Sequence, residues 1–153
     1  MDIEKYIIKL EGIDSERLLI AWIWLTGKDK TTLVITKLGN VLLRDKSGVL
    51  FLLNTEEGSF ETLSNYYADF YNNKLSAEQY FEIFQPELIK DLEGEGKVLK
   101  EGQVYSYSKL PMHGRTIGMK SRHSSNVYEH FDKTGVIHKQ LSDLIEEQRL
   151  ANL

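Results

Sequence analysis

Two apolar runs separated by a short polar turn constrain this chain more than any other part of its sequence. Residues 38–55 read LGNVLLRDKSGVLFLLNT, and DKSG separates two stretches with the alternation of β-strands. Gly48 can adopt the positive φ that a hairpin turn requires. In both stretches, apolar residues occupy the two alternating sets of positions. The segment therefore predicts a β-hairpin that other parts of the chain cover on both faces.

Further strands are predicted on either side of this hairpin. Residues 31–37 (TTLVITK) are rich in β-branched side chains, and a turn over residues 56–59 leads to another short strand or to the start of a helix. Residues 104–108 (VYSYS) form a separate strand candidate. The pattern predicts a three- or four-stranded antiparallel meander, with residues 104–108 as an additional strand.

The N-terminal part is expected to be helical. Ile3, Ile7 and Leu10 share one helical face before Gly12 ends the segment. Asp14 or Ser15 can cap a second helix. Residues 20–25 fit either a helix or a buried strand. We thus treat residues 1–21 as an N-terminal helical segment.

Several helices are predicted after the meander. Ser76 and Gln79 have the spacing of a capping box, and Pro86 can open the next helix, PELIKDLE. Before them comes an apolar stripe at helical spacing, formed by Phe60, Leu63, Tyr67, Phe70 and Tyr71.

The C-terminal third is predicted to contain two helical segments. Ser124, Ser125 or Asn126 can cap the first, which Gly135 interrupts. Helical spacing resumes over residues 136–150, and residues 146–153 are expected to fray. Together the segments predict an α+β fold in which a small antiparallel sheet packs against several helices, as one domain over residues 1–153.

Composition limits the classes of function. The chain has 153 residues, no cysteine and a net charge of -4, which disfavours direct nucleic-acid binding and suits a basic partner. The acidic N-terminus does not resemble a signal peptide, and the longest apolar block, residues 18–25, is too short to span a membrane. We expect a cytoplasmic protein without a disulfide, a cofactor or a membrane partner.

The four histidines are the strongest argument for an enzyme, because imidazoles could hold a metal for hydrolysis. Their spacing does not support this: there is no HExxH motif and no i, i+4 pair on a continuous helix. Ser124 and Ser125 adjoin His123, but adjacent residues seldom face each other in a catalytic triad. We predict no catalytic residue and no metal site, and a metal-dependent hydrolase remains the less favoured alternative. The histidines are His113, His123, His130 and His138.

An anion-binding regulatory module is a second alternative. Arg115 and Arg122 lie near His113 and His123, so residues 111–122 could bind a phosphate or a carboxylate.

Acidic residues near the end of the meander suggest a docking surface for a basic partner, or simply a solvated face. The candidate contacts are Glu56, Glu57, Glu61 and Asp69, with His113 and Arg115 as weaker candidates. A neighbouring tyrosine cluster consists of Tyr66, Tyr67 and Tyr71. It fits either a core or an interface, and we favour the core for Tyr67 and Tyr71.

Three stretches together resemble a bacterial family. They are residues 38–55, residues 99–115 (LKEGQVYSYSKLPMHGR) and residues 135–141 (GVIHKQL). In order and spacing they are similar to the immunity proteins of type VI secretion DNase toxins, which carry a GAD-like (GAD-related) domain. The resemblance covers about residues 22–144. The chain departs from the pattern at Arg115, where the family usually has a second glycine after Gly114.

The resemblance implies a function without catalysis. The protein would bind a cognate secreted toxin, expected to be a basic nuclease domain, and neutralise it. It also implies that residues 105–120 form a strand and then a loop packed near the final helix.

Overall fold

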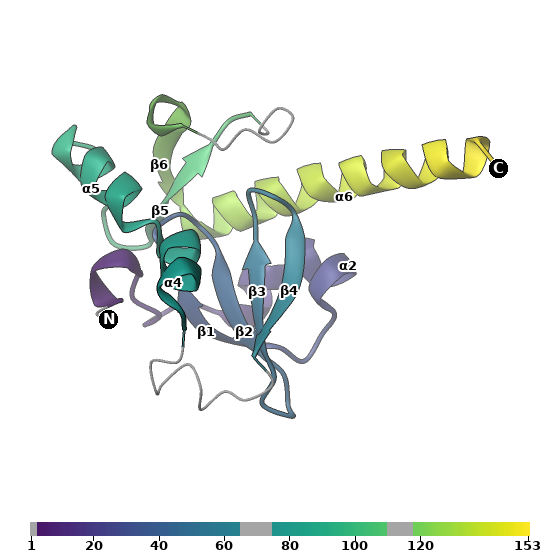
Figure 1. Ribbon diagram of the computed structural model, residues 1–153, viewed down its shortest axis with the longest axis horizontal. Helices are drawn as coiled ribbons and strands as arrows, with labels where there is room; N and C mark the ends of the chain where they lie inside the picture. The colour runs from purple at the N-terminus through teal and green to yellow at the C-terminus, as the bar shows by residue number, and fades with distance from the viewer. Residues whose placement is uncertain (1–2, 65–74, 110–117) are drawn as a thin grey trace.

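The computed structural model describes residues 3–64, 75–109 and 118–153 and confirms an α+β fold. Its larger sheet is antiparallel and has four strands in the order β1-β2-β3-β4, which confirms the predicted meander (Figure 1). The strands are β1 (Thr31–Ile35), β2 (Val41–Arg44), β3 (Leu50–Asn54) and β4 (Ser59–Ser64). Gly48 has a φ of 91° in the turn between β2 and β3, as the hairpin prediction required.

The larger sheet is covered on both faces, which explains its uninterrupted apolar runs. On one face, Val41 and Leu43 pack with Leu18, Trp22 and Phe131, which come from the N- and C-terminal helices. On the other face, helix α4 (Ala77–Phe84) contributes Ile83 and Phe84 against Val34, Leu42 and Leu50 of β1, β2 and β3. The two helical layers enclose the sheet between them (Figure 1).

A second, two-stranded antiparallel sheet consists of β5 (Gln103–Tyr107) and β6 (Arg122–Asn126). The backbone nitrogen of Tyr105 donates to the carbonyl oxygen of Lys37 at 2.7 Å, which ties β5 to the end of the larger sheet. A short 3-10 helix, η3 (Met119–Ser121), precedes β6. The sequence predicts β5 but not β6, whose polar residues indicate only helix caps.

The helix predicted near residues 2–10 is wrong beyond one short turn. A 3-10 helix, η1, spans Glu4–Tyr6, after which Ile7 forms a bridge with Thr36. The backbone nitrogen of Ile8 donates to the carbonyl oxygen of Ile35 at 2.9 Å. This segment is extended because it pairs with the outer side of β1.

The next segment is helical, which resolves the ambiguity of residues 20–25. Asp14 caps α1 by accepting hydrogen bonds from the backbone nitrogens of Glu16 and Arg17. The elements are α1 (Ser15–Leu19), the 3-10 helix η2 (Ile20–Trp22) and α2 (Ile23–Thr26).

The capping box of Ser76 and Gln79 is present at the start of α4, as predicted. Gln85 then takes a left-handed conformation with a φ of 43°, and Pro86 begins α5 (Pro86–Gly94). The apolar stripe predicted as a helix is wrong at its start, because Phe60 and Leu63 belong to β4. The rest of that stripe lies outside the described residues.

The last helix, α6 (Val127–Ala151), is continuous over 25 residues, so the predicted interruption at Gly135 is wrong. Asn126 caps it, accepting from the backbone nitrogens of Tyr128 and Glu129. Gly135 is tolerated because η2 approaches closely: a Cβ there would lie 2.5 Å from the carbonyl oxygen of Ala21.

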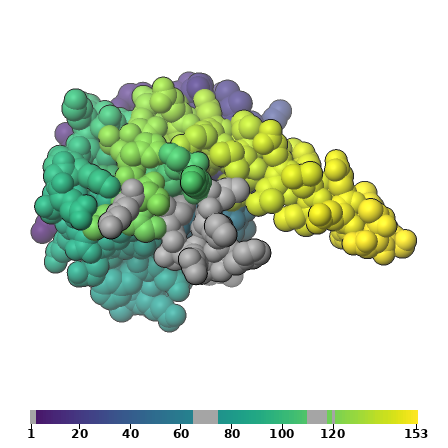
Figure 2. All heavy atoms as spheres, turned by 90° about the horizontal axis from the view of Figure 1, so that it is seen from above, coloured from purple at the N-terminus to yellow at the C-terminus, as the bar shows by residue number. Residues whose placement is uncertain are grey.

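The C-terminal half of α6 projects from the rest of the molecule as an arm (Figures 1 and 2). The side chains from residue 139 onward are exposed. The helix reaches Ala151, so residues 146–151 are helical where the sequence had suggested a frayed tail.

Candidate protein-binding groove

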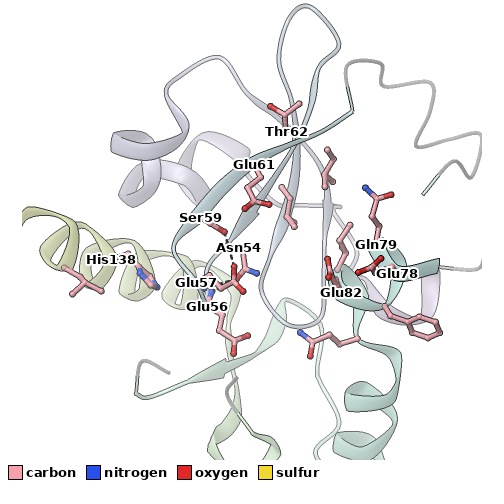
Figure 3. A pocket seen from close by; sticks show the side chains of 16 residues that line it. Asn54, Glu56, Glu57, Ser59, Glu61, Thr62, Glu78, Gln79, Glu82 and His138 are labelled. Atoms are coloured by element: carbon pink, nitrogen blue, oxygen red, sulfur yellow. Dashed lines mark hydrogen bonds between the residues drawn. The ribbon is translucent and has the colours of Figure 1, made fainter. Parts of the chain in front are cut away.

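A groove of about 1220 Å³ lies between α4, α6 and the sheet (Figure 3). Strands β3 and β4 and the turn between them supply its floor, α4 supplies one wall, and His138 and Leu141 of α6 lie along the other side. The lining residues used below are Leu52, Asn54, Glu57, Glu61, Leu63, Glu78, Phe81, Glu82, His138 and Leu141.

The groove exists because α4 covers only part of the sheet. Its Ile83 and Phe84 pack over β1, β2 and the start of β3. On the same face of the sheet, Leu52 is paired with Glu61, and both line the groove beyond the edge of α4. The half-buried side chains of Leu52 and Leu63 give the floor an apolar character.

The groove is acidic and partly apolar. The carboxylates Glu57 and Glu61 face it from the sheet side, and Glu78 and Glu82 face it from α4. All four side chains are exposed. Among the described residues that line the groove there is no lysine or arginine. Phe81 is 55% exposed and Leu141 is 41% exposed. The groove therefore combines some exposed apolar area with a concentration of negative charge that would attract a basic group.

Three of the predicted contact residues, Glu56, Glu57 and Glu61, line this one surface groove, and the side chains of Glu57 and Glu61 are exposed in it. Asn54 holds the backbone from which Glu57 projects, since its side-chain oxygen accepts hydrogen bonds from the backbone nitrogens of Glu56 and Glu57, each at 3.0 Å. The turn after β3 is thereby held in a fixed conformation.

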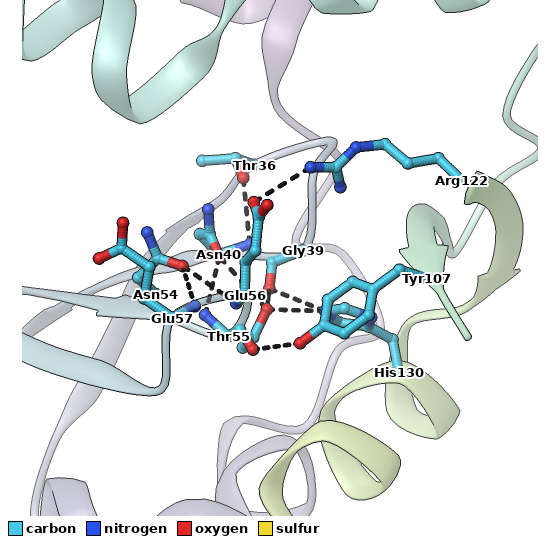
Figure 4. Close-up of polar contacts among 10 residues, drawn as sticks. All are labelled: Thr36, Gly39, Asn40, Asn54, Thr55, Glu56, Glu57, Tyr107, Arg122 and His130. Atoms are coloured by element: carbon cyan, nitrogen blue, oxygen red, sulfur yellow. Dashed lines mark hydrogen bonds and ion pairs between the residues drawn. The ribbon is translucent and has the colours of Figure 1, made fainter. Parts of the chain in front are cut away.

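Glu56 does not have the exposure that its proposed contact role assumed. It is 9% exposed, and its carboxylate accepts from the guanidinium of Arg122 at 3.0 Å (Figure 4). Arg122 is itself 2% exposed. This buried ion pair joins the turn after β3 to β6 and accounts for both charges. Arg122 is thus not an exposed residue that could bind an anion.

His130 lies in a buried polar network beside this ion pair (Figure 4). Its Nε2 lies 2.9 Å from Oγ1 of Thr55 and 3.1 Å from the carbonyl oxygen of Gly39, and its Nδ1 lies 2.7 Å from Oγ of Ser106. Burial lowers the pKa of His130 to about 3, against a smaller opposing effect of the Gly39 carbonyl. The ring is fully buried and neutral, so it joins α6 to both sheets instead of acting on a substrate.

The phenol of Tyr107 extends the same network. Its hydroxyl donates to the carbonyl oxygen of Thr55, and burial, followed by the nearby charge of Glu56, raises its pKa. Thr55 also donates to the carbonyl oxygen of Gly39 at 2.7 Å. These contacts assign a structural role to the threonine that ends the predicted hairpin.

The histidines do not assemble into a metal centre within the described part of the chain. There, no group of three or more His, Asp or Glu side chains is arranged to hold a metal ion. His123 lies on β6 next to Ser124, and neighbours on a strand point to opposite faces, which argues against a Ser-His pair.

The remaining predicted contacts, Asp69, His113 and Arg115, lie outside the described residues, as do Tyr66, Tyr67 and Tyr71. Sequence reasoning missed the contribution of α4. Glu78 and Glu82 are one helical turn apart on the exposed side of a capped helix, which is a detectable signal. What the sequence did not reveal is which part of the sheet that helix leaves uncovered.

Comparisons with protein-family models, with curated proteins and with solved structures found no match. In the described part of the chain, no helix has the length and apolar character needed to cross a membrane.

Proposed function

We propose that this protein acts without catalysis, by binding a basic protein partner in the acidic groove. The observation that carries the proposal is the groove itself, which combines four exposed carboxylates with exposed Phe81 and Leu141. Its volume of about 1220 Å³ exceeds that of an ordinary small-molecule pocket, about 300–1,000 Å³, and suits a segment of a protein.

We propose further that the partner is a secreted toxin and that the protein is its immunity protein. The resemblance of residues 38–55, 99–115 and 135–141 to the type VI DNase immunity family supports this assignment. A nuclease binds the phosphate backbone with a positively charged surface. An acidic groove that covers such a surface would compete directly with DNA.

Charge complementarity would also set the rate of neutralisation. An immunity protein must capture its toxin quickly, and opposite charges raise association rates well above those of neutral surfaces. Phe81 and Leu141 would then supply the apolar contacts that slow dissociation.

The test is co-expression with the product of the adjacent upstream gene, scored by host survival and by co-purification on a tag. We expect rescue and a stable one-to-one complex. Glu61→Lys combined with Glu82→Lys should abolish both, whereas Glu95→Lys, an exposed carboxylate outside the groove, should leave them intact. Equal rescue by the groove variant and the control would exclude the groove as the binding site.

A further inference from the structure

Strand β4 lies at an open edge of the larger sheet (Figure 1). It pairs with β3, and no other described residue pairs with its backbone. The end of β1 at the opposite edge differs, because the N-terminal segment lies against it. The backbone nitrogen of Ile8 donates to the carbonyl oxygen of Ile35, and that of Lys37 donates to the carbonyl oxygen of Tyr6, each at 2.9 Å. Along β4, no described segment has this covering role.

The backbone of β4 can bind a further strand. In an antiparallel pair, alternate residues exchange hydrogen bonds with the partner strand, and the residues between them direct their N–H and C=O groups away from it. The pairing of β4 with β3 is regular from Ser59 to Thr62 and is interrupted by a bulge beyond that point. This regular part is about 13 Å long. About half of its residues therefore present free backbone donors and acceptors, which form a template for another chain.

The acidic groove extends to this edge. Glu61 and Thr62 both line the groove and are both exposed (Figure 3). Consecutive residues of a strand direct their side chains to opposite faces of the sheet. Both can line one groove because its surface includes the main chain of β4 at this point. A segment of a partner that enters the groove therefore reaches the backbone of the edge strand.

The side chains along the edge determine which strand fits it. Residues 59–64 (SFETLS) contain no lysine, arginine or proline, and lysine and proline are residues with which proteins commonly protect such edges. The exposed carboxylate of Glu61 lies on the groove face, and that of Glu57 lies in the turn before β4. A strand beside β4 directs every second side chain to this face, where opposite charges across neighbouring strands are favourable.

A second copy of this chain fits the edge less well. Two-fold pairing of β4 with its copy would bring Glu57 and Glu61 of both chains to one short edge. Like charges on neighbouring strands destabilise the pairing. The occupant that the charges favour is thus a basic segment of a different protein.

We propose that the basic partner adds an extended segment to β4 as a fifth strand of the larger sheet, with lysine or arginine at alternate positions over the groove. Backbone hydrogen bonds to β4 would supply affinity, and the alternate side chains would supply selectivity. These basic side chains would face Glu61 and, across the groove, Glu78 and Glu82 of α4. The inference rests on the proposed function and names the element of the partner that this surface recognises.

The first experiment uses the intact protein and a short peptide in which lysine and threonine alternate. ¹⁵N–¹H NMR follows the hydrogen exchange of the β4 amides with and without the peptide. We expect the outward-directed amides to exchange fast in the free protein and to be protected in the complex. The control peptide has the same sequence with every backbone nitrogen methylated, which keeps the charge and removes the donors. It should bind at least about tenfold more weakly, because several backbone hydrogen bonds are lost.

Matched variants test the contribution of charge. Glu61→Gln should weaken binding of the lysine peptide about two- to fivefold, the range of a cross-strand ion pair. Glu95→Gln changes an exposed carboxylate outside the groove and should leave binding unchanged.

Three results with the peptide would overturn strand addition: no binding, equal binding of the methylated peptide, or binding without protection of the β4 amides. Sedimentation of the free protein supplies a fourth. A dimer whose β4 amides are already protected would show that a second copy occupies the edge.

Hydrogen exchange of the complex with the toxin separates this inference from the proposed function. A stable complex that protects host cells but leaves the β4 amides in fast exchange would reject strand addition and keep the immunity function. Absence of any complex with the toxin would reject the immunity function, and the peptide experiment would then decide whether β4 accepts a basic strand.

Discussion

The imidazole of His130 occupies the space that a side chain at position 39 would need. A Cβ on Gly39 would lie 2.2 Å from Nε2 of His130, and the carbonyl oxygen of the same glycine lies 3.1 Å from that nitrogen. Gly39 also has a φ of 80°, which a residue with a Cβ rarely adopts. The glycine in the turn before β2 is thus required both by its backbone and by a histidine far along the chain.

This relationship predicts unequal effects at two glycines. Gly48→Ala should lower the free energy of unfolding by about 1–2 kcal/mol, because its φ is 91° but no atom lies within 4 Å of the added Cβ. Gly39→Ala should cost at least about 3 kcal/mol, because overpacking against His130 adds to the same backbone strain. Urea denaturation of both variants measures the difference, and equal losses would contradict the close packing of His130.

A similar prediction applies to Gly135, which lies within helix α6. Gly135→Ala gains about 1 kcal/mol of helix propensity but places a methyl group against the backbone of Ala21, so we expect a net loss of about 1–2 kcal/mol. Gly94→Ala at the end of α5 meets no neighbouring atom and should be neutral or slightly stabilising. Thermal unfolding compares the two, and a stabilised Gly135→Ala would show that α6 can move away from η2.

The buried ion pair between Glu56 and Arg122 should contribute far more to the free energy of unfolding than an exposed ion pair does. Arg122→Met removes the guanidinium from beside the buried carboxylate of Glu56, and we expect a loss of about 3–5 kcal/mol. The matched comparison is Arg17 with Asp132, an exposed pair at 2.6 Å, where Asp132→Asn should change the stability little. Adding Glu56→Gln to Arg122→Met should recover part of the loss. A double-mutant cycle with no coupling would refute the ion pair.

Two buried histidines predict that stability falls at acidic pH. Burial lowers the pKa of His130 to about 3 and also lowers that of His138, so the unfolded chain binds more protons than the folded one below the ordinary histidine pKa of about 6.5. The stability from neutral rings is complete above about pH 6.5 and is lost as pH falls toward the folded pKa values. Each ring can contribute up to about 1.4 kcal/mol per pH unit.

The measurement is urea denaturation between about pH 7 and about pH 5, where most carboxyl groups remain ionised. His138→Phe should reduce the slope of stability against pH, because one titrating ring is removed. An unchanged slope would mean that folding does not lower the pKa of His138.

The acidic groove predicts a salt-dependent association with a basic partner. The association rate of the complex should fall as ionic strength rises, because screening shortens the reach of the four carboxylates. The combination Glu61→Gln and Glu82→Gln should flatten that dependence, with little change in stability since both side chains are exposed. Stopped-flow kinetics at several salt concentrations tests this, and a rate independent of salt would argue against electrostatic capture.

Local signals in the sequence were sufficient for much of the fold. Gly48, the capping box at Ser76 and the cap at Asn126 act within a few residues of themselves, and each has the predicted role. The double-sided alternation of β2 and β3 correctly indicated cover on both faces, because burial is what permits apolar side chains on both sides of a strand.

The errors arose where a distant segment decides the local structure. Ile7 is extended because it pairs with Thr36, and α6 continues through Gly135 because Ala21 lies against it. The sequence predicts Glu56 as a surface charge because its partner, Arg122, is remote along the chain. The sequence predicts Glu57 and Glu61 as acidic contacts. Whether they line the same groove as Glu82 depends on where α4 packs against the sheet.

The division between buried and exposed charges has a consequence for the evolution of such a protein. The charges that hold the elements together, at Glu56 and Arg122, are enclosed, whereas the other carboxylates of the groove are exposed. Replacement of a groove carboxylate alters what the surface attracts and leaves the packing intact. Under the proposed function, a new target can be acquired through surface substitutions alone, and two descendants with the same scaffold need not share a partner.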